Sequence, residues 1–347
     1  MEVSLTWKEL SEQIAASPGL SLLIGASDTG KTTLAEFLIK EWTQQGLKVA
    51  FVDGDMGQST VGPPGTIGMR IYDTSNFDFA SCRYTKNLSL FFIGSFSPVG
   101  HLLQTVVGMK VLVQQAESQN PDIILVDTTG LVTGVVGEHL KYRKSQLLKP
   151  RHLIFIQKSR ELEHLKNLLK QQDRIVHELV SSSQVHVRSH EDRRKYRIQR
   201  LREYFQGARV CRINFPTTIY KDFGHFTGIP LSDEELGFCS QILEGRILYG
   251  ERGCDSLFLV KKDFVSHRNQ QTLKVKYHVQ NIIVTNRHRL NKRLVALFDQ
   301  KGELLTLGII QNWRLESKQL EVLGHLEHAE KVQYMEVGKE IIDLLAA

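Results

Sequence analysis

Residues 25–32 read Gly25-Ala26-Ser27-Asp28-Thr29-Gly30-Lys31-Thr32, and this octet matches the phosphate-loop pattern G-x-x-x-x-G-K-[ST] at every fixed position. An apolar run over residues 20–24 leads into the octet, and a stretch typical of a helix follows over residues 33–40. The pattern therefore predicts a strand, a loop and a helix in the order that binds phosphate, with backbone N–H groups and the positive helix end facing the anion. We expect a nucleoside triphosphate to bind here.

The side chains of the octet have separate tasks at such a site. Lys31 is expected to reach the β- and γ-phosphates, and the hydroxyl of Thr32 is expected to contact Mg²⁺. Glycine at positions 25 and 30 lets the backbone curl closely around phosphate. The residues expected to hold the nucleotide are Gly25, Ala26, Ser27, Asp28, Thr29, Gly30, Lys31, Thr32 and Thr33.

Composition limits the class of protein. The 347 residues include 41% apolar and 24% charged residues, which is typical of a soluble globular chain with one large or two ordinary domains. No apolar stretch approaches the length of a membrane span, and the first residues lack a secretory signal. The four cysteines are scattered without a C-x-x-C pair, so we expect no zinc site, no disulfide framework and a cytoplasmic location.

Apolar runs alternate with helical stretches through most of the chain. This alternation predicts an α/β fold, a P-loop NTPase domain whose doubly wound, mostly parallel sheet binds ligands at the carboxyl ends of its strands. The expected strands are 20–24, 48–53, 88–94, 122–127 and 152–157, and the expected helices are 5–17, 31–45, 99–118, 137–148 and 160–171. Near residue 245 the pattern changes to short strand-like runs, so we expect a P-loop domain over 1–244 and a small β-rich C-terminal domain over 245–347.

A pair of carboxylates follows the second expected strand. Residues 52–59 read VDGDMGQS, which places Asp53 and Asp55 two residues apart at the strand end. Such carboxylates raise each other's pKa unless a cation or a proton lies between them, so the pair favours Mg²⁺ or an acceptor hydroxyl at this point. An acid-rich turn that only caps the strand is the simpler alternative.

The strand expected over 122–127 ends in Asp127-Thr128-Thr129-Gly130. An aspartate in this position after a phosphate loop is the expected partner of Mg²⁺, directly or through water. Thr128, Thr129 and Gly130 then offer hydroxyl and backbone donors to a substrate phosphate.

The net charge of +6 is concentrated in residues 188–212, which carry nine basic residues against three acidic ones. Ser189 is expected to cap a helix together with Asp192, which would place Arg193, Arg197 and Arg200 on one face. An arginine-bearing lid over about 186–207 would neutralise a migrating phosphoryl group, whereas a merely solvated charged face is the alternative.

Taken in order, G-x-x-D-x-G-K-T, D-G-D-x-G-Q-S with G-P-P, D-T-T-G and the arginine-rich helix ending at 201–207 resemble the polynucleotide 5′-hydroxyl kinases. That family includes the kinase subunit of the pre-mRNA cleavage factor, the pre-rRNA-processing kinases and their archaeal and bacterial relatives. The resemblance covers about residues 20–245. It implies transfer of the γ-phosphate of ATP to the 5′-hydroxyl end of RNA, and in some members of DNA, with Mg²⁺ present.

The resemblance also implies roles for single residues. Its catalytic residues are Lys31, Asp55, Arg193 and Arg197, with Asp55 as the general base and the register of the arginines open by one turn. The substrate-binding residues are then Gln58, Thr128, Thr129, Gly130 and Arg194. The metal ligands that we expect from the residues themselves are Thr32, Asp53 and Asp127.

The chain departs from the family pattern in two ways. About twenty residues precede the octet, where the cleavage-factor relatives carry a β domain, so the chain resembles a compact prokaryotic form. Asp127 stands where several relatives have Asn.

Two other functions stay open. A regulatory or metallochaperone-type GTPase would share the aspartates, but the N-K-x-D sequence that reads guanine is replaced by Gln157-Lys158-Ser159-Arg160. An ATP-binding RNA-processing subunit with little catalysis is the second alternative. The sequence sets no preference between RNA and DNA or between ATP and GTP. It indicates a nucleic acid with a 5′-hydroxyl end as the partner, and no membrane.

Overall fold

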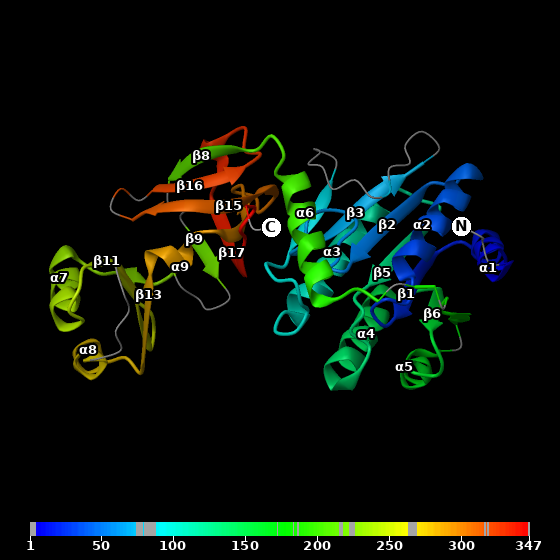
Figure 1. The fold of residues 1–347 in the computed structure, drawn as a ribbon, viewed down its shortest axis with the longest axis horizontal. Coiled ribbons are helices and arrows are strands. Elements are labelled where there is room, and N and C mark those ends of the chain that lie inside the picture. The colour runs from blue at the N-terminus through cyan, green and yellow to red at the C-terminus, as the bar shows by residue number, and fades with distance from the viewer. Residues whose placement is uncertain are drawn as a thin grey trace. The chain divides into compact units, whose positions relative to one another are not determined.

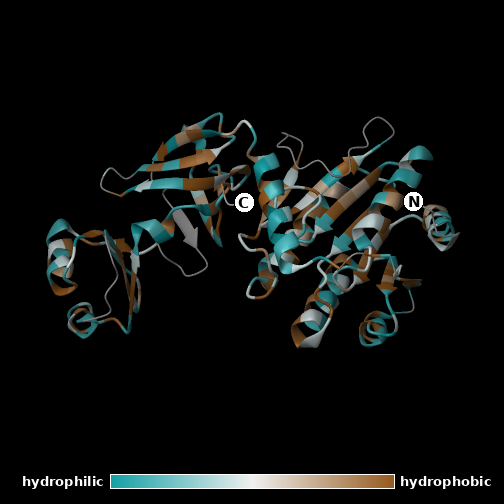
Figure 2. Cartoon of the chain, in the orientation of Figure 1, coloured by the Kyte–Doolittle hydropathy of each residue, from teal (hydrophilic) through white to brown (hydrophobic). Residues whose placement is uncertain are grey.

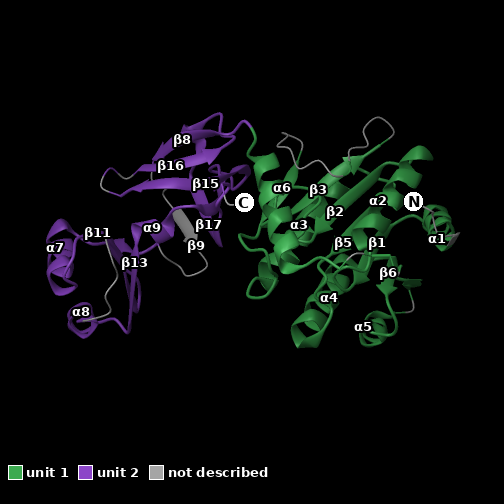
Figure 3. Cartoon of the chain, viewed as in Figure 1, with its two compact units in different colours: residues 1–206, 346–347 green, residues 207–345 purple. Residues whose placement is uncertain are grey.

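The computed structural model describes residues 5–73, 79, 88–171, 173–182, 184–185, 187–214, 218–221, 226–262, 269–315, 317 and 319–345. The chain forms two compact units, one from residues 1–206 and the other from residues 207–345 (Figure 3). The sequence pattern placed the division near residue 245. The second unit begins earlier because the strand Arg209–Asn214 (β8) pairs with the strand Gln319–Gly324 (β16) near the end of the chain.

The first unit is an α/β layer structure (Figure 1). Its strands in the described residues are β1 Leu20–Gly25, β2 Val49–Gly54, β3 Thr66–Tyr72, β4 Ser89–Phe92, β5 Ile123–Thr128, β6 His152–Gln157 and β7 Ile175–Val180. Its helices are α1 Leu5–Ala16, α2 Lys31–Gln44, α3 Leu102–Glu117, α4 Gly134–Leu148, α5 Glu163–Leu169 and α6 His190–Tyr204. The sheet has the order β4-β3-β2-β5-β1-β6-β7.

Strands β2, β5, β1, β6 and β7 are parallel, and β3 and β4 add an antiparallel edge. Asp53 of β2 is in register with Asp127 of β5, and Leu22 of β1 is in register with Val126. The carboxyl ends of β1, β5 and β2 therefore lie together at one edge of the sheet. The predicted α/β class with a mostly parallel sheet is confirmed.

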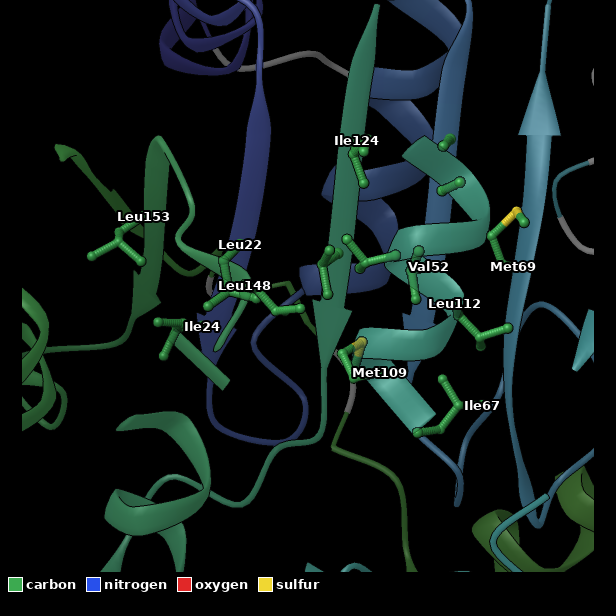
Figure 4. Packing of buried hydrophobic residues seen from close by; sticks show 14 of the residues in the cluster. Leu22, Ile24, Val52, Ile67, Met69, Met109, Leu112, Ile124, Leu148 and Leu153 are labelled. Atoms are coloured by element: carbon green, nitrogen blue, oxygen red, sulfur yellow. The ribbon is translucent and has the colours of Figure 1, made fainter. Parts of the chain in front are cut away.

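The sheet is buried on both faces. Leu22 and Ile24 of β1 belong to a core that includes residues of α3, α4 and α5, of which Figure 4 shows Met109, Leu112 and Leu148. Leu23, between them, belongs to the opposite core, which includes residues of α1 and α2. Because successive strand residues point to opposite faces, a strand buried on both sides is apolar at every position. This explains why the central strands are readable as continuous apolar runs.

Two strands of the first unit were not expected from the sequence. One is β3, which contains Gly68. An added Cβ at Gly68 would lie 1.9 Å from the carbonyl oxygen of Val61, so the strand passes close to the backbone there. β7 alternates exposed and buried residues, since it lies at the edge of the sheet. The expected helix over 160–171 is shorter, Glu163–Leu169, because the chain turns there to enter β7.

The second unit contains two sheets in its described residues. Their orders are β10-β11-β12-β13 and β8-β16-β15-β14-β17-β9. The further strands are β9 Thr218–Lys221, β10 Ile229–Pro230, β11 Ile247–Arg252, β12 Ser256–Lys261, β13 Asn281–Asn286, β14 Arg293–Phe298, β15 Leu304–Arg314 and β17 Tyr334–Ile341, and the helices are α7 Asp233–Ile242, α8 Gln270–Tyr277, α9 Arg287–Leu290 and the 3₁₀ turn η1 Ala329–Lys331. The expected β-rich C-terminal character is thus confirmed.

Hydropathy follows this architecture. Figure 2 shows the central strands of the large sheet mainly in brown and α6 mainly in teal, so α6 is the polar helix of the first unit. Within the described residues, none of the helices has both the length and the apolar character that crossing a bilayer requires.

Two histidines meet inside the first unit. The Nδ1 atom of His152 lies 3.0 Å from Nε2 of His177, and Nε2 of His152 lies 2.7 Å from the carbonyl oxygen of Ser17. Because a carbonyl only accepts, His152 carries its proton on Nε2, so Nδ1 accepts from Nε2–H of His177. Burial, together with His152 nearby, lowers the pKa of His177 to about 4.

The histidine pair predicts a loss of stability in mild acid. In the unfolded chain a histidine takes up a proton near pH 6.5, whereas folded His177 stays neutral down to about pH 4. Unfolding therefore takes up a proton in this window, and we expect about 2 kcal/mol of unfolding free energy to be lost between pH 7 and pH 5. Urea titrations at both pH values should show a smaller loss for His177→Gln. Equal losses in both proteins would contradict this origin.

Candidate active site

The phosphate loop connects β1 to α2 as the sequence predicted. Asp28 and Gly30 have positive φ angles of 55° and 91°, which turn the loop into the first turn of the helix. The Thr29 hydroxyl donates to the carbonyl oxygen of Ala26 over 2.9 Å. Nζ of Lys31 donates to the same carbonyl over 2.7 Å, and the side chain is only 7% exposed. Nζ carries three donors, so Lys31 also has donors to offer to a phosphate in the loop.

Asp53 organises the loop that follows β2. Its Oδ1 atom accepts from the N–H of Asp55 over 3.0 Å. Its Oδ2 atom accepts from the N–H groups of Thr60 and Val61 and from the hydroxyl of Ser59. Burial, followed by the charge of Asp127, raises the pKa of Asp53 to about 7. Both oxygens serve the loop, so this geometry gives no support to the predicted role of Asp53 as a metal ligand.

Asp55 lies at the surface of the cavity described below. Its Oδ1 atom accepts from the N–H groups of Gly57 and Gln58, both over 3.0 Å, so the loop fixes the direction of the carboxylate. The side chain of Gln58 accepts in turn from Nη1 of Arg188 over 3.1 Å.

The turn after β5 lies against the phosphate loop. An added Cβ on Gly130 would lie 2.2 Å from Oγ of Ser27, so only glycine permits this approach. Asp127 is buried, and its Oδ2 atom accepts from the hydroxyl of Thr32 over 3.1 Å. The hydroxyl of Thr128 donates to the carbonyl oxygen of Leu23 over 2.7 Å.

Helix α6 begins as predicted and is tied to both loops. Ser189 and Asp192 form the expected capping box. Nη2 of Arg193 lies 2.6 Å from the carboxylate of Asp28 in the phosphate loop. The hydroxyl of Tyr196 donates to the carbonyl oxygen of Ser59 over 3.0 Å, and Arg200 donates to the carbonyl oxygen of Thr60. The helix thus lies over the nucleotide site in this structure.

These elements enclose a cavity of about 780 Å³. The lining has a polar part with Asp55, Gln58, Arg188, Arg193 and Tyr196. The lining also includes the phosphate loop from Ser27 to Thr33, an apolar part with Trp7, Phe37, Ile156, Val180 and Val185, and the further polar residues Thr60, Ser181, Ser182 and Gln184. This volume and this mixture of charged and apolar groups suit a nucleotide.

The structure brings together most of the residues that the sequence singled out, but not all. Arg197 stacks over the ring of Phe96, 5.0 Å from its centre, and Arg194 is exposed; neither lines the cavity. Asp53, Asp127 and the Thr128–Gly130 turn also lie outside the lining of the cavity. Arg188, Tyr196 and Trp7 line it and were not expected to. Arg188 belongs to the basic segment, yet only the fold shows that it reaches Gln58.

Thr32 and Asp127 fit a magnesium ion best. A hydroxyl and a carboxylate oxygen are hard oxygen ligands, and they already lie 3.1 Å apart. Burial raises the pKa of Asp127, while Lys31 acts to lower it. A cation at this point would relieve the cost of the buried carboxylate. Among the described residues no cluster of three or more His, Cys, Asp or Glu forms a metal site of its own.

The apolar part of the cavity predicts that a bound base changes the fluorescence of Trp7. The ring of Trp7 lies 5.5 Å from that of Phe37, whereas Trp42 and Trp313 are fully buried. We expect ATP to quench the tryptophan emission, because stacking places the base on the ring. Tripolyphosphate, which lacks a base, should bind without quenching. A quench of equal size in Trp7→Phe would show that the base lies elsewhere.

Comparisons with known proteins agree with the geometry. A polyribonucleotide 5′-hydroxyl-kinase of Methanocaldococcus jannaschii is 30% identical over 93% of this chain and 86% of its own length. A protein of the same name from Pyrococcus abyssi is 29% identical over 93% of this chain and 87% of its own. A CLP1 homologue of Nematostella vectensis is 30% identical over 54% of this chain and 45% of its own.

The fold is also that of a solved structure. Clp1p in a complex with Pcf11p matches with a TM-score of 0.64 and 15% identity, covering 96% of this chain and 78% of that one. The family model described as "mRNA cleavage and polyadenylation factor CLP1 P-loop" matches residues 25–207, which include the phosphate loop, both aspartate loops and α6. The chain therefore belongs to the CLP1 P-loop family.

Proposed function

We propose that this protein is an ATP-dependent polynucleotide 5′-hydroxyl kinase that acts on RNA. One observation carries the proposal: a phosphate loop, a fixed carboxylate and an arginine helix line a single cavity, as phosphoryl transfer to a hydroxyl requires. The archaeal relatives named polyribonucleotide 5′-hydroxyl-kinases support the choice of RNA and of its 5′ end.

Each part of the proposed reaction is assigned to a residue of this chain. Lys31 donates to the β- and γ-phosphates of ATP. Oδ1 of Asp55 is held by two N–H groups, so Oδ2 is the oxygen that faces the 5′-hydroxyl, orients it and accepts its proton. Arg193 exchanges its contact with Asp28 for the migrating phosphoryl group.

Thr32 and Asp127 are the residues that would hold Mg²⁺, which supplies charge neutralisation at the phosphates when bound. Gln58, which lines the cavity, and the Thr128–Gly130 turn, which lies outside its lining, are the proposed contacts of the nucleic acid near its 5′ end. Arg197 and Arg194 keep their proposed roles only through movement of α6, because neither lines the cavity in this structure.

The GTPase alternative lacks its base-reading carboxylate. Glu161 is the first acidic residue after β6 in the sequence, and its two oxygens accept from the N–H groups of Lys158 and Ser159. Glu163 and Glu178, which line a cavity beside Gln157, are both paired with Lys166.

The first test is transfer of labelled γ-phosphate from ATP to a short 5′-hydroxyl RNA, beside a 5′-phosphorylated RNA and the matching 5′-hydroxyl DNA. We expect label on the 5′-hydroxyl RNA and none on the phosphorylated control, and the ratio to DNA measures substrate preference. Hydrolysis of ATP without label on any oligonucleotide would contradict the proposal.

Two substitutions test the roles of the residues. Lys31→Ala should abolish transfer, because the triphosphate loses its cation. Asp55→Asn should lower kcat by about 10²–10⁴, the range for a positioned proton acceptor. Glu36→Gln, at an exposed carboxylate on α2, is the matched control and should retain full activity. Full activity in folded Asp55→Asn would remove Asp55 from the role of base.

A further inference from the structure

Helix α4 carries two lysines that have no exposed surface. Lys141 and Lys144 are both 0% exposed, and their spacing places them on the same face of the helix. An ammonium group in a protein interior costs several kcal/mol unless other groups compensate its charge. Neither lysine forms an ion pair within the part of the chain that the structure describes. The burial of both lysines therefore needs an explanation.

Lys141 is bonded to the turn at the end of β5. Its Nζ atom donates to the hydroxyl of Thr128 over 2.7 Å and to the carbonyl oxygen of Thr129 over 2.5 Å. The Thr128 hydroxyl in turn donates to the carbonyl oxygen of Leu23, two residues before the phosphate loop begins. A continuous chain of hydrogen bonds thus joins α4, the turn and β1.

The position of that turn determines its contact with the phosphate loop. Gly130 packs directly against Ser27 of the phosphate loop, with no room for a Cβ atom. The nucleotide side and the acceptor side of the site are therefore in contact here.

Lys144 has no hydrogen-bond partner for its buried Nζ atom. Burial lowers the pKa of Lys144 to about 8, and the charges of Asp55, Asp127 and Asp53 act in the opposite direction. At neutral pH the amine is therefore still a cation. The charges of Asp55 and Asp127 favour this cationic form through space.

Resting on the proposed function, we propose that Lys141 and Lys144 are positioning residues of the transfer site. Lys141 holds the Asp127–Gly130 turn against the phosphate loop. Lys144 balances the carboxylates at the strand ends while no divalent cation is bound, and it adds positive charge behind the triphosphate. Simple packing of two long side chains is the competing explanation.

Binding to the nucleotide-free protein distinguishes the two explanations for Lys144. Lys144→Met keeps a long unbranched side chain, one atom shorter, and removes the charge without loss of a hydrogen bond. We expect Mg²⁺ to bind more tightly by about threefold or more, because the carboxylates lose a cation. We expect tripolyphosphate to bind more weakly by about threefold or more for the same reason. Calorimetry measures both without any catalysis.

A packing role cannot produce shifts of opposite sign. Arg143→Met is the matched control on the same helix, since Arg143 is exposed, and it should leave both affinities unchanged. Affinities that move together, or not at all, in Lys144→Met would overturn the proposal for this residue.

Kinetics test Lys141. Lys141→Met should lower kcat with the 5′-hydroxyl RNA by about tenfold or more, with the KM for ATP changed by about twofold at most, because the turn serves the acceptor. Lys141→Gln keeps a donor and should recover part of the loss. Wild-type kcat in Lys141→Met, or no recovery in a folded Lys141→Gln, would overturn the proposal.

Failure of this inference and failure of the proposed function are separable. If Lys141→Met does not fold, as circular dichroism would show, the binding experiments on Lys144→Met still decide the proposal. If the protein transfers no phosphate, the opposite shifts of Mg²⁺ and tripolyphosphate affinity remain measurable.

Discussion

The parallel pairing of β1, β5 and β2 is the constraint on which the whole site depends. Because these three strands run in the same direction and in register, their carboxyl ends reach the same edge of the sheet. The phosphate loop, the Asp53–Val61 loop and the Asp127–Gly130 turn leave from that edge. Residues about a hundred positions apart in the chain thereby come within hydrogen-bond distance, as Thr32 and Asp127 do.

Charge balance inside the first unit is the second constraint. Three carboxylates stand at the strand ends, two of them buried, and burial raises the pKa of both Asp53 and Asp127. Different groups compensate each of the two buried carboxylates. Asp53 is satisfied by its own loop, and Asp127 has Thr32 and the N–H of Thr128. Lys144 of α4 is the buried cation that we propose to balance these carboxylates.

Helix α6 shows how one element can be both polar and well anchored. Its capping box fixes where it begins, and Arg193, Tyr196 and Arg200 tie one face to the two loops. Arg193 forms an ion pair with Asp28 in this structure. In the proposed reaction, a bound nucleotide would separate these two side chains.

The sequence by itself determined the phosphate loop, the central strands and the start of α6, because each depends on neighbouring residues: a fixed octet, apolar runs and a capping pair. It also indicated both aspartate turns. Tertiary structure alone decided which carboxylate is committed to its own loop, that Arg188 rather than Arg194 reaches the cavity, and that Lys141 and Lys144 are buried. A lysine in a polar helix carries no sign of burial in its sequence, since burial is set by what packs against the helix.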